Sequence, residues 1–235
     1  CATFTPDGGM RRVTQETQAR LGDKTLMPAT SPRADTRPEV GARLKQALSA
    51  EDAVQIALLN NTSLRADLGE LKIAEADLVQ AGRLSNPGVM FGRLTQADSV
   101  LIERKFTLDI LGLFTLPLRY QLETRRFEQA QLRAASNILR VAADTRRAYF
   151  QALAAKQTVE YLVQAQTAAE ASAQIAQRMA QVGNFSRLDQ MREQVFYAET
   201  TSQLARAKQN ADATREQLIR LLGLSDEANT LRLPE

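Results

Sequence analysis

Histidine and tryptophan are absent from the 235 residues, and cysteine occurs once. Without His or a second Cys, the common zinc sites, an imidazole general base and an internal disulfide are excluded. No stretch approaches the ~18 consecutive apolar residues that a transmembrane helix needs. There is also no nucleophile–base pair and no phosphate-binding glycine loop. The sequence therefore predicts a protein that is not an enzyme and that uses neither a cofactor nor a metal.

Neither sign of charge is in large excess, because the chain has 30 Lys and Arg and 27 Asp and Glu, a net charge of +3. Acids and bases are interspersed, which is typical of solvated helix faces and argues against a nucleic-acid partner. Aromatic residues make up 5% of the chain against 44% hydrophobic residues in all. The apolar content is mostly Ala and Leu and favours long packed helices over one large globular core.

Glycine and proline are missing from residues 118–182 and again from residues 187–222. Both stretches are rich in strong helix formers and contain no residue that predicts the end of a helix. At ~1.5 Å per residue the first helix would be roughly 95 Å long. Gly223 follows the second stretch at a C-cap position. We therefore expect residues 117–223 to form a long helical hairpin with its tip at residues 182–189.

Each arm of this hairpin carries small and apolar residues at alternating spacings of three and four, as in a coiled-coil seam. The first arm has Leu162, Ala165, Ala169, Ser172, Ala176 and Met179, and the second has Leu204, Ala207, Ala211, Thr214, Leu218 and Leu221. A second apolar edge consists of Ala168, Ala171 and Ile175. Two edges favour packing on two sides, as in a closed ring of helices; a plain antiparallel coiled coil is the alternative.

The turn has its own local chemistry. Gly183 can take a left-handed conformation that ends the first arm. Ser186 and Asp189 fit a capping box, with Ser186 as N-cap and the carboxylate of Asp189 near the positive end of the second arm. These roles are structural and need no function to explain them.

Residues 1–48 are polar and punctuated by Pro and Gly, so we expect an extended tether with one short helix at Met10–Leu21. Its first residue is the only cysteine, Cys1, which we expect to be the acylated cysteine of a bacterial lipoprotein; an incidental cysteine is the alternative. Residues 49–86 predict two helices. Ser49 caps the first, and their apolar faces are Ala53, Ile56, Ala57 and Leu59, then Leu64, Leu68, Leu71, Ala74, Leu78 and Ala81.

Between residues 87 and 116 the apolar period changes to two. Val89 and Phe91 alternate with Met90 and Gly92, and a similar pattern follows a predicted turn at residues 96–99. Two strands of about ten residues suit a tilted crossing of an outer membrane, with a soluble hairpin as the alternative. A lone hairpin is barely stable and must pair with other strands. Pro117 suits the first turn of the long helix. Residues 224–235 read as a linker toward a further segment.

The order of these elements resembles one structural repeat of the TolC-type outer membrane efflux proteins, in particular their lipid-anchored members. The resemblance rests on four stretches: SAEDAVQIALLNN at residues 49–61, AEADLVQA at residues 74–81 with Asn86-Pro87, Val182 to Asp189, and LLGL at residues 221–224. The fold class is thus mainly α with a small β part. It combines a long antiparallel helical hairpin, a segment of an α-barrel, with a two-stranded β-hairpin that contributes to an outer membrane β-barrel.

The resemblance implies a passive export duct in the bacterial outer membrane, lipid-anchored and extended into the periplasm. It implies a trimer that docks on a periplasmic adaptor and, through it, on an inner membrane pump. The adaptor-docking and aperture residues carried over by position are Gly183, Asn184, Phe185, Ser186, Arg187, Leu188 and Asp189. Asp189 repeated around a ring would select cations and favour opening, with Arg187 as a candidate counter-charge.

Family members usually carry two such repeats, and this sequence holds only the first. A twelve-stranded barrel would then need six copies, or the chain is a fragment, which we favour. The competing hypothesis is a non-pore periplasmic hairpin that acts as an adaptor or protein-interaction module. Adaptors usually flank their hairpins with all-β modules, and no run of short strands is present here.

Overall fold

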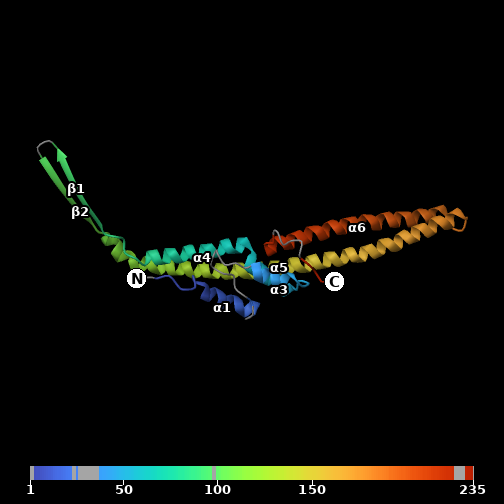
Figure 1. Cartoon of the computed structure of the whole chain (residues 1–235), viewed down its shortest axis with the longest axis horizontal. Coiled ribbons are helices and arrows are strands. Elements are labelled where there is room, and N and C mark those ends of the chain that lie inside the picture. The colour runs from blue at the N-terminus through green and yellow to red at the C-terminus, as the bar shows by residue number, and fades with distance from the viewer. Residues whose placement is uncertain (1–2, 23–24, 26–36, 97–98, 225–230, 235) are drawn as a thin grey trace. The chain divides into compact units, whose positions relative to one another are not determined.

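The computed structural model describes residues 3–22, 25, 37–96, 99–224 and 231–234. The elements in chain order are α1 (Met10–Leu21), α2 (Arg37–Leu44), α3 (Ala50–Asn60), α4 (Thr62–Ala81), β1 (Gly88–Gln96), β2 (Ser99–Thr107), α5 (Ile110–Gln181) and α6 (Arg187–Leu222) (Figure 1). The chain divides into two compact units, residues 1–24 with 63–138 and residues 25–62 with 139–235. The predicted fold class, mainly α with one strand pair, is confirmed.

The two strands form an antiparallel hairpin whose register runs from Gly88 opposite Thr107 to Gln96 opposite Ser99. Residues 97–98 of the predicted turn lie outside the described residues. Each strand has nine residues. The change of apolar period from helical to alternating thus located both strands, but the predicted hairpin ran on to residue 116, whereas β2 ends at Thr107.

The long helix begins at Ile110, earlier than the predicted start at Pro117, so Pro117 lies inside α5. The reason is an upstream cap. The carboxylate of Asp109 accepts a 2.7 Å hydrogen bond from the backbone N–H of Gly112. This bond satisfies one of the free donors of the first turn and starts the helix before the proline.

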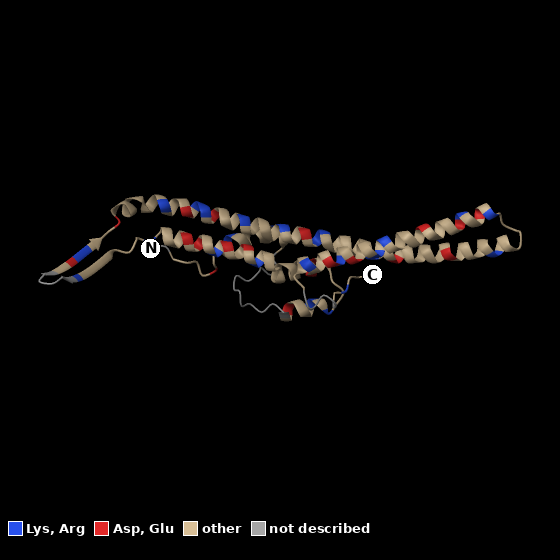
Figure 2. Ribbon diagram, turned by 90° about the horizontal axis from the view of Figure 1, so that it is seen from above, with Lys and Arg blue, Asp and Glu red and all other residues tan. Residues whose placement is uncertain are grey.

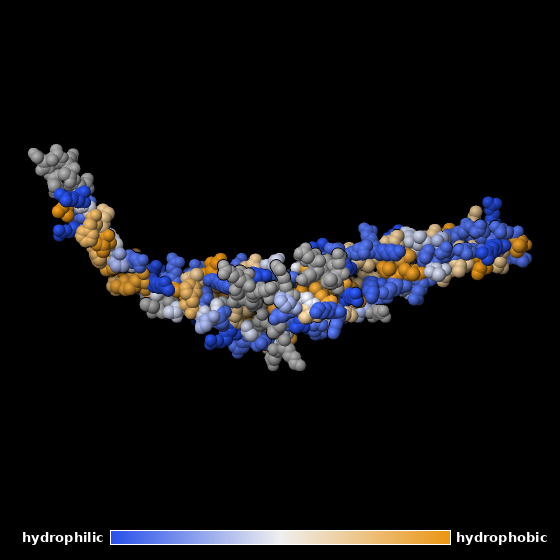
Figure 3. Space-filling model, in the orientation of Figure 1, coloured by the Kyte–Doolittle hydropathy of each residue, from blue (hydrophilic) through white to orange (hydrophobic). Residues whose placement is uncertain are grey.

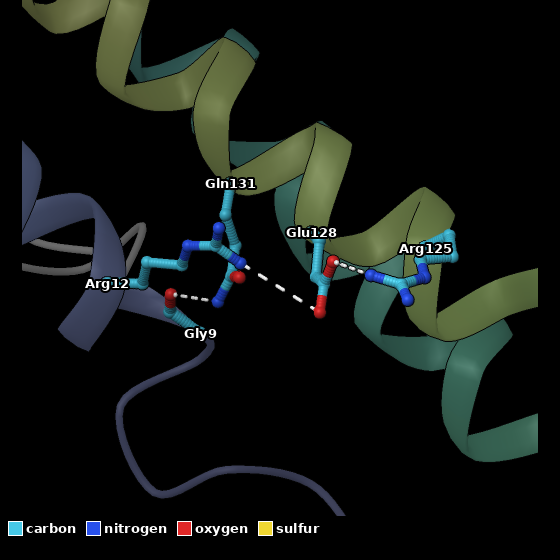
Figure 4. A network of polar contacts seen from close by, with 5 residues as sticks. All are labelled: Gly9, Arg12, Arg125, Glu128 and Gln131. Carbon is cyan, nitrogen blue, oxygen red and sulfur yellow. Dashed lines mark hydrogen bonds and ion pairs between the residues drawn. The ribbon is translucent and has the colours of Figure 1, made fainter. Parts of the chain in front are cut away.

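In the first unit, the N-terminal segment is fastened to helices rather than left as a free tether. The side chain of Gln131 donates a 2.9 Å hydrogen bond to the carbonyl of Gly9, at the start of α1, and Arg12 lies 4.0 Å from Glu128 (Figure 4). A second attachment joins Thr5 to α4: its N–H and its hydroxyl each donate a 2.6 Å bond to one oxygen of Glu75. Glu75 is only 4% exposed.

The buried face of α4 follows a different path from the predicted one. Leu64, Leu68 and Leu71 are buried as expected, but the face continues through Glu75 and Val79, while Ala74 and Leu78 are half-buried. The prediction followed the apolar residues, whereas a helix face with ~3.6 residues per turn continues from Leu68 and Leu71 to position 75. Position 75 is acidic, so the apolar pattern did not reveal the buried position that receives Thr5.

The tether prediction is correct for α1 at Met10–Leu21 and wrong for residues 37–44, which form α2. The prolines of residues 1–48 predict breaks, but Pro38 occupies the first turn of α2. A proline is tolerated there because the missing N–H would have no intrahelical partner.

In the second unit, the end of α3 is joined to the end of α6. The side-chain amide of Asn60 donates to the carbonyls of Leu222 (3.3 Å) and Gly223 (2.7 Å), and that of Asn61 donates to Leu221 (2.9 Å). The start of α3 is capped as predicted, since Ser49 accepts a 3.0 Å bond from the N–H of Asp52. The predicted face of α3, Ala53 to Leu59, is buried.

Close by, an extended segment of residues 231–234 lies against the same unit. The N–H of Leu48 donates a 2.8 Å bond to the carbonyl of Arg232, and the hydroxyl of buried Tyr149 donates a 2.8 Å bond to the carbonyl of Leu48. Lys156 donates a 3.0 Å bond to the carbonyl of Pro234. These bonds use backbone groups that a packed loop would otherwise leave unsatisfied.

The arms of the hairpin, α6 and the second half of α5, pack along the predicted seam (Figures 1 and 2). Ala169, Ala176 and Leu218 are buried, and a 2.6 Å bond from Ser172 to Glu193 joins the arms. Met179, at the tip end of the seam, is exposed instead. Acidic and basic residues are interspersed along both arms (Figure 2). None of the helices described is long and apolar enough to cross a membrane.

Candidate functional site

The hairpin tip is built by two opposed helix ends. Gly183 adopts φ +79°, the left-handed conformation predicted for it. Its N–H donates to the carbonyl of Ala180 (3.1 Å), and the N–H of Asn184 donates to that of Met179 (2.9 Å). This pair of bonds is a Schellman motif, which satisfies the last carbonyls of α5 and turns the chain sharply.

The second helix starts with the predicted cap. Ser186 accepts a 3.0 Å bond from the N–H of Asp189, and its hydroxyl donates a 2.6 Å bond to the Asp189 carboxylate. The cation beside Asp189 is Arg192, at 3.3 Å, and not the predicted Arg187. Arg192 lies one helical turn further along α6, where side chains three residues apart are neighbours. Asp189 is therefore partly compensated within its own helix.

The tip carries an apolar surface, and Leu188 is the one residue of it that the sequence analysis identified. Leu188, Met191, Val195 and Phe196 are all at least half exposed, and with Arg192 and Glu199 they line a shallow cavity of about 360 Å³. At the turn itself, Val182 is exposed and Phe185 is half-buried, and Figure 3 shows apolar surface at this end of the hairpin. We call Leu188, Met191, Val195 and Phe196 the tip patch. Its signal was in the sequence, as apolar spacings of three and four from Leu188 on the side away from the seam.

The β-hairpin presents two unlike faces, because residues opposite each other in an antiparallel pair share a face. One face has Val89, Phe91, Arg93, Ile102, Arg104 and Phe106, and the other has Gly88, Met90, Gly92, Leu101, Glu103, Lys105 and Thr107. The first face is the more apolar, and its Val89, Phe91, Ile102 and Phe106 are all exposed. We call these four residues the strand face.

The hairpin has two strands and therefore two unpaired edges. Such edges leave backbone donors and acceptors open to further strands. A strand pair with exposed large apolar side chains and open edges is stable only when other strands and an apolar phase cover it.

Cys1 lies outside the described residues, so the structure does not place the predicted lipidation site. Within the part of the chain that is described, no group of three or more His, Cys, Asp or Glu side chains could hold a metal ion. The described residues present exposed apolar surfaces at the strands and at the tip.

The chain is similar to known proteins both in sequence and in fold. The sequence model of the family described as "Outer membrane efflux protein" matches residues 53–224. No curated protein sequence matches the chain. The fold is similar to that of a membrane protein from Pseudomonas aeruginosa, at a TM-score of 0.67 and 19% identity, over 79% of this chain and 47% of that one.

It is also similar to the CmeC outer membrane channel of Campylobacter jejuni, at a TM-score of 0.66 and 17% identity, over 79% of this chain and 43% of that one. The chain thus spans less than half the length of either solved structure. The inferred resemblance to TolC-type proteins is confirmed. Since the family match extends over most of its residues, the chain belongs to the outer membrane efflux protein family.

Proposed function

We propose that this chain forms part of the wall of a passive export duct in the bacterial outer membrane. The strand face carries the proposal: four large apolar side chains, Val89, Phe91, Ile102 and Phe106, are exposed on one face of an open-edged hairpin. In contact with lipid, these side chains would be removed from water, which is energetically favourable for apolar surface. The long stems of Arg93 and Arg104 can carry their charges toward the membrane surface.

A strand pair cannot close a barrel, so the duct needs more strands than the two in the described part of the chain. These would come from further copies, a trimer if a second repeat is present and six copies if it is not. The second apolar edge of α5 supports the same assembly. Ala168, Ala171 and Ile175 are exposed in the single chain, although Ala169 and Ala176 beside them are buried by α6. A neighbouring hairpin on this edge would continue the helical wall into the periplasm.

The tip is the proposed docking surface for a periplasmic adaptor, which would link the duct to an inner membrane pump. Gly183 and Ser186 fix the turn, so the tip patch is presented by an ordered scaffold. Binding there would cost little conformational entropy. Asn184 and Phe185 lie between the two helix ends, and Arg187 is the first residue of α6. A ring of Asp189 residues, partly neutralised by Arg192, would surround the aperture.

A lipid on Cys1 fits the same arrangement. Thr5 is held by Glu75 near the end of α4 from which the chain proceeds to β1. Cys1 and Thr5 are four residue steps apart, which can span no more than roughly 14 Å. An acyl chain on Cys1 would therefore stay near the membrane end of this unit, where the strands are proposed to insert.

The test is to measure ion conductance across planar lipid bilayers for the unmodified protein and for two variants with substitutions at adjacent positions. Phe91→Lys places a charge on the strand face, and Met90→Lys places one on the opposite face. A Lys that faces lipid costs about 2–4 kcal/mol at mid-membrane, so Phe91→Lys should reduce insertion at least tenfold. Met90→Lys should insert and conduct.

Equal behaviour of the two variants would contradict the assignment of the strand face. If the protein is soluble without detergent once Cys1 is replaced, and does not conduct ions, the result would support the non-pore adaptor hypothesis instead.

A further inference from the structure

The first turns of α5 form an uncharged apolar segment directly after β2. Between Asp109 and Arg119 the chain reads ILGLFTLPL, without a charged residue. We call residues 110–118 the collar. Five of its six large apolar side chains are at least half exposed, namely Ile110, Leu111, Leu113, Phe114 and Leu118, and Leu116 is half-buried. Figure 3 shows apolar surface continuing from the strands into the first turns of α5.

The collar is ordered by its own polar ends. Asp109 accepts a 2.7 Å bond from the N–H of Gly112, and Arg119 donates a 2.9 Å bond to the carbonyl of the same glycine. Both charged side chains thus turn onto the backbone of the first turn. The apolar side chains point away from it without cover from the described part of the chain, and a contiguous exposed apolar surface of this kind marks a site of interaction.

We infer that the collar lies in the membrane interface, at the boundary between headgroups and acyl chains of the periplasmic leaflet. The inference rests on the proposed function, in which β1 and β2 cross the outer membrane. A strand of nine residues rises about 3.3 Å per residue, and tilted by about 40° it spans roughly 23 Å, close to the ~25 Å apolar band of such barrels. The chain that leaves β2 at Thr107 therefore emerges at the edge of the band.

The composition of the collar fits that position. Interfacial helices combine exposed Leu and Phe side chains with charged residues that stay in water, as Asp109 and Arg119 do at the two ends here. The exposed ring of Tyr120 follows at once, and tyrosine is enriched at the headgroup level. The occupant of the collar is thus lipid, continuous with the lipid around the strand face.

The chain contains no Trp, so one introduced Trp reports its own surroundings. Three phenylalanines provide matched positions: Phe114 in the collar (77% exposed), Phe106 on the strand face (66%) and Phe150 further along α5 (57%). Each is replaced by Trp in the chain, which is reconstituted into vesicles of phosphatidylethanolamine and phosphatidylglycerol. Fluorescence is quenched with lipids brominated near the headgroup, with lipids brominated near the end of the acyl chain, and with aqueous iodide.

The Phe114→Trp variant is expected to lose fluorescence to bromine near the headgroup more than to deep bromine, and to be shielded from iodide. Phe106→Trp should respond to lipid bromine, and Phe150→Trp to iodide alone. If Phe106→Trp responds to lipid while Phe114→Trp behaves like Phe150→Trp, the collar is in water and the inference fails, whereas the proposed function stands.

Shielding of Phe114→Trp from iodide without quenching by either lipid would mean that protein, such as a second copy, covers the collar; this also overturns the inference. Failure of Phe106→Trp to respond to lipid would overturn the proposed function together with the inference built on it. Because all three rings are exposed, helical circular dichroism should be unchanged in every variant.

Discussion

The side-chain amide of Asn60 donates a 2.7 Å hydrogen bond to the carbonyl of Gly223, and the backbone of Asn60 lies against the same glycine. Gly223 has φ +67°, and a Cβ added to it would lie 2.5 Å from the carbonyl oxygen of Asn60. The end of α6 thus requires glycine for two reasons, its conformation and its close approach to α3. Gly183 at the tip requires it for its conformation alone, since a Cβ there would meet nothing within 4 Å.

The two glycines therefore make a matched pair for a stability measurement. Gly183→Ala should lower the free energy of unfolding by about 1–2 kcal/mol, the cost of left-handed backbone for a residue with a Cβ. Gly223→Ala should cost distinctly more, because the backbone of Asn60 must also move. Urea unfolding followed by circular dichroism measures both, and an equal loss in the two variants would show that the contact with Asn60 relaxes freely. Gly183→Val should likewise disturb docking at the tip more than folding.

The elements that could be predicted from the sequence are those with strong local signals. Gly183 and Ser186 located the tip, Ser49 located the start of α3, and the alternation around Phe91 located the strands. Each of these signals acts within a few residues, so the rest of the fold does not override it.

The features that could not be predicted depend on distant partners. Nothing near Glu75 in the sequence indicates that Thr5 binds its carboxylate, and the apolar pattern pointed to Ala74 instead. The early start of α5 depends on a cap at Asp109 that was overlooked beside Pro117. The tip patch was missed because spacings of three and four had been assigned to the seam between the arms.

The buried carboxylate of Glu75 should be what holds the N-terminal segment. Glu75→Ala removes the acceptor of both bonds from Thr5, and bonds to charged groups contribute about 1.5–3 kcal/mol. We expect the amide proton of Thr5 to exchange at least tenfold faster, while the helices keep their protection. Glu70→Ala on the exposed side of α4 is the control. Unchanged exchange at Thr5 would mean that Gln131 and Arg12 suffice to fasten the segment.

Tyr149 should make stability sensitive to alkaline pH. Burial raises the pKa of its hydroxyl above the ordinary value of 10.0, and the negative charge of Glu51 raises it further. Because the folded state favours the protonated form, the contribution of Tyr149 is fully present below the unfolded-state pKa and is lost as pH rises through the folded-state pKa.

Tyr149→Phe removes the bond to the carbonyl of Leu48 and should cost about 0.5–1.5 kcal/mol near neutral pH. The difference from the unmodified protein should shrink above pH ~10, where the unfolded tyrosine ionises. Thermal unfolding at a series of pH values gives the comparison, with Tyr161→Phe at an exposed position as the control. A difference that stays constant up to strongly alkaline pH would contradict the coupling.

Phe196 should be the anchor of the tip patch. Exposed aromatic residues beside a shallow cavity are frequent hot spots, and their truncation commonly costs more than about 1 kcal/mol of binding. Phe196→Ala should therefore weaken binding of the proposed periplasmic adaptor by about tenfold, as measured by calorimetry or surface plasmon resonance. Phe150→Ala, which removes an equally exposed ring from α5, should leave the affinity unchanged. Since both rings are solvent-exposed, neither variant should lose much unfolding free energy. Equal weakening by the two changes would assign the effect to general loss of apolar surface and would remove the tip patch from the docking site.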